Sequence, residues 1–260
     1  MTLQEAIATK SIDVKFLSNG KYSGTSIIAQ IKNSNRSKIK LTIPAGTLYH
    51  PEDNGEQSLI QLEDVYLTLL PSSSETTSIA AFCSEANDRS PSSNSTMQIG
   101  KSKDPSLLKM ITYLKKNSVN KESYQDAVWA ISDKKSVSNI VADDSSTRAF
   151  RTFIATITNQ KDTWFTSPQH VQVDNQGNFI YETVNIAGKI SFDCSKGDKV
   201  RQDIYHSNGE PVFVSEKYMT AQTNHVNYSF RLKVKGWEKG EYYIRIHNGI
   251  KDLATYEFSV

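Results

Sequence analysis

The amino-acid sequence predicts a mainly β protein of two β-sandwich domains, the first of which carries a three-helix insertion. Three observations lead to this fold class. Short segments of alternating apolar and polar residues, separated by turn residues, fill roughly the first 80 positions and return after about position 165. Between them, residues 104–160 carry apolar side chains at helical spacing. A length of 260 residues suits two domains, which we place at residues 1–164 and 165–260.

Alternation in the first domain predicts antiparallel strands joined by tight turns. Asn19-Gly20 between two alternating segments is a strong hairpin signal, because type I′ turns need positive φ angles that Asn and Gly adopt readily. Residues 85–103 are rich in Ser, Asn and Pro and are predicted to form a loop. Short strands and frequent turns together indicate a β-sandwich. The expected strands are residues 11–16, 26–32, 38–43, two strands within 59–70, and 76–82.

Three helices are expected within residues 104–160. The first begins at Asp104-Pro105, where an acidic N-cap residue precedes a proline at the first helical position. The third is expected to begin after Asp144-Ser145. The second helix covers residues 122–133, and its apolar face is formed by Tyr124, Ala127, Val128 and Ile131.

The second domain, residues 165–260, shows the pattern of an Ig-like β-sandwich. Ser207-Asn208-Gly209 joins two alternating segments as a hairpin. Seven or so short strands in about 95 residues are typical of an Ig-like domain. The clearest expected strands are residues 200–205, 212–215, 227–234, 241–246 and 254–260. Its aromatic residues alternate between two faces, so that one set belongs to the core and the other could form a binding stripe: Tyr218, Tyr228, Phe230, Tyr242 and Tyr243.

Composition restricts the partners and the compartment. The formal net charge is +2, which leaves no broad basic surface for nucleic acid. No apolar run is long enough to span a bilayer, so no transmembrane segment is expected. The first 14 residues lack a charged region followed by an apolar one, so no signal peptide is visible. Frequent Ser, Thr, Asn and Tyr, β-rich patterning and two cysteines favour an extracellular or cell-envelope protein.

The motifs of common enzymes and metal sites are absent from the sequence. The five histidines are scattered singly and form no metal-ligand spacing with cysteine or carboxylate residues. The sequence has no G-x-S-x-G, no P-loop, no H-E-x-x-H and no EF-hand spacing. We therefore expect no catalytic residues, no metal and no cofactor, and a protein that is not an enzyme.

One pair of residues carries the sharpest chemical hypothesis. Cys83 ends an apolar segment, Ile79-Ala80-Ala81-Phe82, and Gln125 lies on the second expected helix. Trp129 lies one turn after Gln125, so the two side chains can touch.

Two segments resemble known families. Residues 180–260 resemble the bacterial Ig-like modules of Bacteroidetes-type secreted proteins, through Val200–Tyr205, Asn208-Gly209 and Lys239–Ile246. Residues 38–135 resemble the thioester domains of bacterial surface adhesins, through Ala81-Phe82-Cys83, Pro91 and the stretch from Tyr124 to Trp129. The second resemblance implies that Cys83 and Gln125 condense into an internal thioester. It also makes Phe82 and Trp129 candidates for the apolar cover that shields the thioester from water.

Simpler interpretations of the same residues remain open. Cys83 is most simply a small buried residue at a strand end, since Cys is among the most often buried residue types. Gln125 is compatible with a hydrogen bond to a loop carbonyl, and Trp129 with a core or plug position. Cys194 is expected in the core of the second sandwich.

These observations favour a non-catalytic secreted or cell-envelope module that binds or adheres to a protein or a surface polysaccharide. A covalent adhesin that uses a Cys83–Gln125 thioester is the first alternative. An accessory domain protein of an extracellular enzyme system is the second. The oligomeric state is left open.

Overall fold

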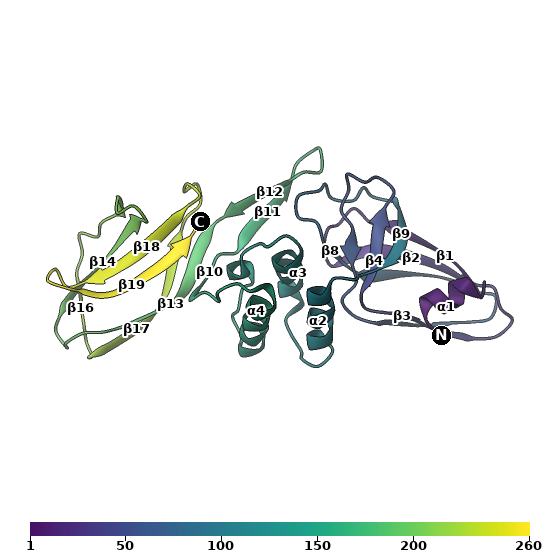
Figure 1. The fold of residues 1–260 in the computed structure, drawn as a ribbon, viewed down its shortest axis with the longest axis horizontal. Helices are drawn as coiled ribbons and strands as arrows, with labels where there is room; N and C mark the ends of the chain where they lie inside the picture. The colour runs from purple at the N-terminus through teal and green to yellow at the C-terminus, as the bar shows by residue number, and fades with distance from the viewer. The chain divides into compact units, whose positions relative to one another are not determined.

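The computed structural model describes residues 1–260, which divide into two compact units (Figure 1). The first unit contains residues 1–162 and 171–180, and the second contains residues 163–170 and 181–260. Strands account for 42% of the chain and helices for 17%, so the prediction of a mainly β protein is confirmed. None of the helices is long and apolar enough to cross a membrane.

A seven-stranded sheet, in the order β7-β2-β1-β9-β4-β5-β8, forms the framework of the first unit and curls into a half-barrel. A second sheet pairs β3 with β6. All these pairs are antiparallel, and the predicted pairing of β1 with β2 is confirmed. The connection is longer than a tight Asn-Gly turn, because it spans residues 19–24 and only Gly20 and Gly24 in it have positive φ angles. The strands are β1 (Ile12–Ser18), β2 (Thr25–Asn33), β3 (Ile39–Ile43), β4 (Thr47–Pro51), β5 (Leu59–Ile60), β6 (Val65–Leu69), β7 (Ser74–Ala80), β8 (Phe82–Cys83) and β9 (Thr96–Lys101).

The prediction of a loop over residues 85–103 is wrong at its end. Thr96–Lys101 forms β9, which pairs with β1 on one side and β4 on the other in the seven-stranded sheet. Met97 and Ile99 are the two apolar residues with large side chains in β9, and only Met97 is buried. This apolar pattern is too short to stand out in the sequence, and the strand forms between partners on both sides.

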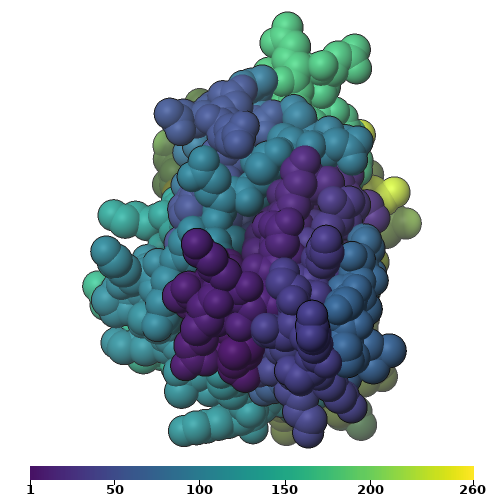
Figure 2. All heavy atoms as spheres, turned by 90° about the vertical axis from the view of Figure 1, so that its right-hand side faces the viewer, coloured from purple at the N-terminus to yellow at the C-terminus, as the bar shows by residue number.

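The sequence reading also missed a short helix at the N-terminus, α1 (Leu3–Ala8). Thr2 and Glu5 form a capping box: the Thr2 hydroxyl accepts from the Glu5 N–H and the Glu5 carboxylate accepts from the Thr2 N–H. Leu3 and Ala6 are fully buried, and they anchor the helix. The segment, purple in Figure 2, lies on the outer surface of this unit.

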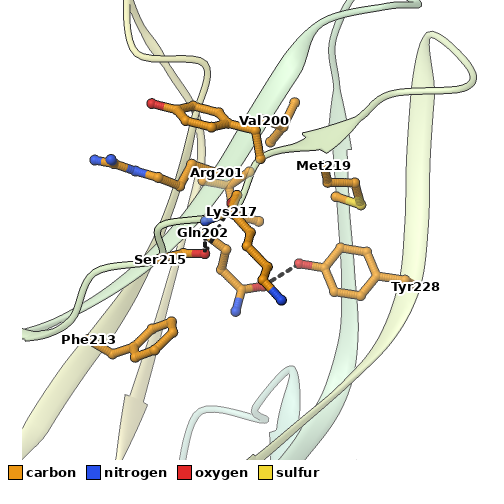
Figure 3. Close-up of a pocket in the computed structure, with 10 residues that line it drawn as sticks. Val200, Arg201, Gln202, Phe213, Ser215, Lys217, Met219 and Tyr228 are labelled. Carbon is orange, nitrogen blue, oxygen red and sulfur yellow. Dashed lines mark hydrogen bonds between the residues drawn. The ribbon is translucent and has the colours of Figure 1, made fainter.

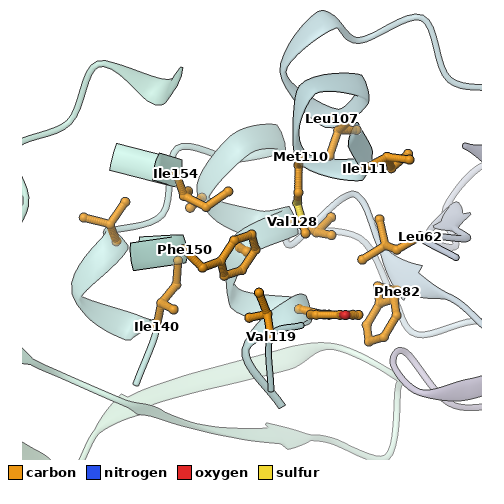
Figure 4. Close-up of a cluster of buried hydrophobic side chains, with 14 of the residues drawn as sticks. Leu62, Phe82, Leu107, Met110, Ile111, Val119, Val128, Ile140, Phe150 and Ile154 are labelled. Carbon is orange, nitrogen blue, oxygen red and sulfur yellow. The ribbon is translucent and has the colours of Figure 1, made fainter. Parts of the chain in front are cut away.

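The three predicted helices are present as α2 (Pro105–Leu114), α3 (Tyr124–Ser132) and α4 (Ser145–Thr158), with short 3-10 turns at Lys121–Ser123 and Val137–Asn139. Asp104 caps α2 through the N–H groups of Ser106 and Leu107. The helices and the sheet share one apolar core, in which Leu62 and Phe82 meet Val128, Phe150 and other buried side chains (Figure 4). This shared core fixes α3 against β8, which carries Cys83.

The second unit has a three-stranded sheet, β10-β13-β17, and a sheet in the order β15-β14-β18-β19, with β16 paired to β14. Inward-facing side chains of both sheets form one core, including Ile190, Phe230, Ile244 and Phe258. A separate hairpin pairs β11 with β12, and residues 171–180 of this region belong to the first unit. The strands are β10 (Phe165–Thr166), β11 (Gln169–Val173), β12 (Phe179–Thr183), β13 (Asn185–Asp193), β14 (Lys199–His206), β15 (Pro211–Phe213), β16 (Met219–Thr220), β17 (His225–Lys233), β18 (Glu241–His247) and β19 (Asp252–Ser259).

Candidate functional site

Cys83 and Gln125, 42 positions apart in the sequence, meet inside the first unit. Cys83 ends β8, and both residues are buried. The Cys83 N–H donates to the Tyr22 carbonyl at 2.8 Å, and the Ala81 N–H donates to the Gly24 carbonyl at 2.8 Å. These bonds hold the backbone around Cys83 in an extended conformation beside residues 22–24.

The side-chain amide of Gln125 forms hydrogen bonds with both backbone groups of Cys83. Its oxygen, Oε1, accepts from the Cys83 N–H at 3.0 Å, and its nitrogen, Nε2, donates to the Cys83 carbonyl at 2.9 Å. The Cys83 N–H is thus shared between the Tyr22 carbonyl and the Gln125 amide. Two bonds in opposite directions fix both the position and the orientation of the amide plane.

The Cys83 sulfur has three polar contacts of its own. The Trp129 indole Nε1–H and the Glu85 backbone N–H both donate to Sγ at 3.3 Å, and the thiol donates to the Glu85 carbonyl at 3.3 Å. Burial raises the pKa of the Cys83 thiol to about 12, although the hydrogen bonds from Trp129 and Glu85 act in the opposite direction. The group is therefore a neutral thiol at pH 7, and both cysteines of the chain are free.

Trp129, whose indole contacts the sulfur, packs with two other aromatic rings, Tyr22 and Phe179, and we call these three rings the aromatic cover. Tyr22 stacks on Trp129, with ring centroids 5.8 Å apart and an interplanar angle of 11°. Phe179 meets Tyr22 edge-on at 5.1 Å and Trp129 at 6.0 Å. Phe82, the other residue expected to shield the site, instead packs against Tyr124 in the helical core at 5.6 Å.

Asp126 places a carboxyl group next to this site. It follows Gln125 on α3, and burial raises the pKa of Asp126 to about 7. The pKa of the Tyr22 phenol is also raised, first by burial and then by the nearby charges of Asp126 and Cys83. Tyr22 therefore lies close to both groups.

A pocket of about 680 Å³ adjoins the aromatic cover, because Tyr22 lines it. Three loops form its walls: residues 20–23, 89–93 and 173–177. The Ser90 N–H donates to the Gly177 carbonyl at 3.0 Å and ties two of these loops together. Its lining residues include both charge signs, with Lys21, Arg89 and Asp174.

The arrangement combines a thiol with a primary amide in a site that is shielded from water, and these two groups can condense. Cys194, which was expected in the core of the second sandwich, is instead partly exposed and packs against the outside of that core. No group of three or more His, Cys, Asp or Glu side chains in the chain could hold a metal ion. The sequence analysis did not identify Tyr22, Phe179 or Asp126 as site residues. Asp126 could have been suspected because it follows Gln125 directly, whereas Tyr22 and Phe179 are far from both candidate residues in the sequence.

No protein-family model matches the sequence, and no curated protein matches it.

Proposed function

We propose that the protein is a secreted or cell-envelope adhesion module that attaches covalently to its partner through an internal Cys83–Gln125 thioester. The observation that carries this proposal is the pair of hydrogen bonds between the Gln125 amide and the backbone of Cys83. They hold the amide against the residue whose sulfur would attack it. Because folding has already brought the two groups together, the reaction does not have to meet the entropy cost of joining two separate reactants.

Thioester formation here is a condensation that releases ammonia. The Cys83 sulfur attacks the side-chain carbonyl carbon of Gln125, a carbon–sulfur bond forms, and the carbon–nitrogen bond breaks. The thiol proton leaves with the amide nitrogen as ammonia. Negative charge develops on Oε1 during the attack, and this oxygen already accepts the Cys83 N–H at 3.0 Å. A donor aimed at that oxygen stabilises the tetrahedral intermediate.

Burial supports the survival of the product. A thioester exposed to water hydrolyses, whereas Cys83 is completely buried and Gln125 is 8% exposed. The aromatic cover of Tyr22, Trp129 and Phe179 adds apolar surface beside the sulfur. The same burial keeps the thiol protonated, so formation is expected to be slow compared with an activated cysteine.

The stored acyl group would be transferred to a primary amine of the partner. The amine nitrogen attacks the thioester carbon, an amide bond forms, and the Cys83 thiol is released with a proton. The pocket beside Tyr22 is the approach that the geometry favours, because it is the open space that adjoins the aromatic cover. Displacement of the Tyr22 ring would open a path toward the sulfur.

A non-covalent binding module is the second candidate function, and one observation favours it. The Cys83 sulfur and the Gln125 amide both have hydrogen-bond partners before any reaction. Gln125 would then have a structural role, in which its amide satisfies the backbone N–H and carbonyl of Cys83 in place of a neighbouring strand. A protein or surface polysaccharide would bind elsewhere on the molecule.

Incorporation of a fluorescent primary amine separates the two functions. The native protein is incubated with the amine, unfolded, digested and mapped by mass spectrometry. The covalent proposal predicts a single labelled position, Gln125, and a matching free thiol at Cys83. Cys83→Ala should abolish the label, whereas Cys194→Ala should retain it. A folded wild-type protein without label at Gln125 would leave the non-covalent function.

A further inference from the structure

The second unit contains a pocket of about 300 Å³ at one side of its sandwich (Figure 3). It lies between β14 and β17, which belong to the two facing sheets, and under the segment that joins β15 to β16. This volume is at the small end of the range for ligand pockets, which begins at roughly 300 Å³, and it suits one ring-sized group. The pocket lies in the second unit, whereas Cys83 lies in the first.

Apolar side chains are unusually exposed around this pocket. Phe213 and Tyr218 are each 52% exposed and Met219 is 45% exposed, and all three line it. Val214, between them in the sequence, is 46% exposed. Exposed apolar groups that gather at one place on a soluble domain commonly mark a binding surface. The rings of Phe213 and Tyr218 offer flat surfaces on which an apolar ring face can stack.

The polar groups in the pocket are hydrogen-bond donors. The Tyr228 hydroxyl donates to Oε1 of Gln202, which leaves the Gln202 Nε2–H groups without a partner. The Lys217 ammonium makes no hydrogen bond or ion pair, and its side chain extends over Gln202 toward Tyr228 (Figure 3). An uncompensated ammonium beside a free amide N–H₂ is complementary to a carboxylate.

A buried polar cluster holds a second cation at the edge of the pocket. Arg201 forms an ion pair with Asp203 at 3.0 Å, and its guanidinium lies 5.7 Å from the centre of the Tyr218 ring. Asp203 is completely buried and also accepts from the Ser215 N–H at 2.9 Å. His247 Nδ1 accepts from the Gly249 N–H at 3.2 Å, and its Nε2 lies 2.8 Å from the Asp203 carboxylate and 3.4 Å from Arg201 Nε. Arg201 is thereby held in place.

We infer that this pocket binds one acidic sugar residue, of the hexuronic acid class, from an acidic polysaccharide. The sugar ring would stack on Tyr218 or Phe213, and its carboxylate would accept from Lys217 and Gln202. No carboxylate lines the pocket, since Glu216 is absent from the lining and Asp203 is enclosed behind Arg201. The aromatic rings favour a ring-shaped ligand over a simple inorganic anion.

Titration of the whole protein with small probes, followed by amide chemical shifts in NMR spectra, tests the inference. Glucuronate should produce saturable shifts at residues 200–202 and 213–219. Glucose, which keeps the ring, and inorganic phosphate, which keeps the charge, should each bind at least about tenfold more weakly. Lys217→Gln should weaken glucuronate binding about fivefold to tenfold, and added salt should weaken it in the wild type.

Lys239→Gln provides the matched control, because Lys239 is an exposed lysine of the same unit outside the pocket. It should leave the affinity for glucuronate unchanged, and so should Cys83→Ala. Equal affinity for glucuronate and glucose, equal affinity for glucuronate and phosphate, or no saturable shift would each overturn the inference. Unchanged affinity in Lys217→Gln would do the same.

Discussion

The indole nitrogen of Trp129 lies 3.3 Å from the sulfur of Cys83 and donates a hydrogen bond to it. The two residues are separated by 46 positions and are both buried. This hydrogen bond favours the thiolate and so lowers the pKa of Cys83, but burial raises that pKa by more. Trp129 therefore contributes polarity as well as cover to the candidate thioester site.

Trp129→Phe should keep most of the packing and remove the N–H donor. A hydrogen bond of this kind contributes about 1 kcal/mol, so we expect thioester formation to slow by about fivefold. The measurement is the fraction of chains that have lost ammonia as a function of time after refolding. Trp164→Phe removes another indole donor, to the Glu257 carbonyl in the second unit, and should leave that fraction unchanged. An unaltered rate in Trp129→Phe would contradict the role assigned to the indole.

Gln125→Glu should both destabilise the first unit and prevent thioester formation. An ionised glutamate cannot donate to the Cys83 carbonyl and has no ammonia to release, and the lost bond should cost about 2 kcal/mol of stability. Urea unfolding and intact mass report the two effects. Gln160 is the matched control, since it donates to the Lys135 carbonyl and accepts from the Val137 N–H. Gln160→Glu should lower stability similarly and still lose ammonia. If Gln160→Glu instead kept its full mass, the absence of ammonia loss in Gln125→Glu would be explained by lower stability alone.

The two cysteines should differ in their reaction with iodoacetamide. Cys194 is partly exposed, whereas Cys83 is buried and burial raises its pKa to about 12. Only Cys194 should be alkylated in the native protein, faster as the pH rises because more thiolate forms. Peptide mapping identifies the labelled residue. After methylamine treatment and unfolding, Cys83 should also be alkylated. Rapid labelling of Cys83 in the native state would show that the site is open.

Asp126 should make the first unit less stable as the pH rises. Burial raises its pKa to about 7, so the folded chain retains a proton that the unfolded chain has released. Stability should therefore fall between about pH 4 and pH 7 and change little above. Asp126→Asn should remove this slope and stabilise the protein at pH 8, by on the order of 3 kcal/mol. Urea unfolding at several pH values measures it.

Asp144 provides a control of opposite sign. Hydrogen bonds from Ser146 and Thr147 hold the pKa of its carboxyl well below the usual range, so its contribution to stability is lost as the pH falls. Asp144→Ala should destabilise the protein at pH 7 and have little effect at low pH. If Asp126→Asn showed the same dependence, the burial of Asp126 would not be the cause of the slope.

The helical part of the fold could be predicted from the sequence because its signals are local. Asp104 followed by Pro105 marks the start of α2, and the apolar spacing from Tyr124 to Ile131 marks α3. The α1 helix was missed although Thr2 and Glu5 stand at the spacing of a capping box, because six residues give little periodicity. The β9 strand could not be predicted, since its pairing with β1 and β4 is set by distant residues.

Only part of the candidate site could be predicted from the sequence. Cys83, Gln125 and Trp129 stand out through their residue types and through resemblance to a family. Tyr22 and Phe179 do not, because a turn residue and a hairpin residue meet Trp129 only through the tertiary fold. For the same reason, the cluster of Asp203 and His247 has no sequence signal: its members lie on paired strands, 44 positions apart.

The intact mass of the purified wild-type chain, measured under acidic unfolding conditions without added amine, tests the central proposal most directly. We expect the wild-type chain to be lighter than its sequence by one ammonia, and the Cys83→Ala variant to have its full mass. Prior treatment with methylamine should make the wild-type chain heavier than its sequence by one methylene group, with the modification at Gln125. A wild-type chain of full mass that does not react with methylamine would contradict the proposal.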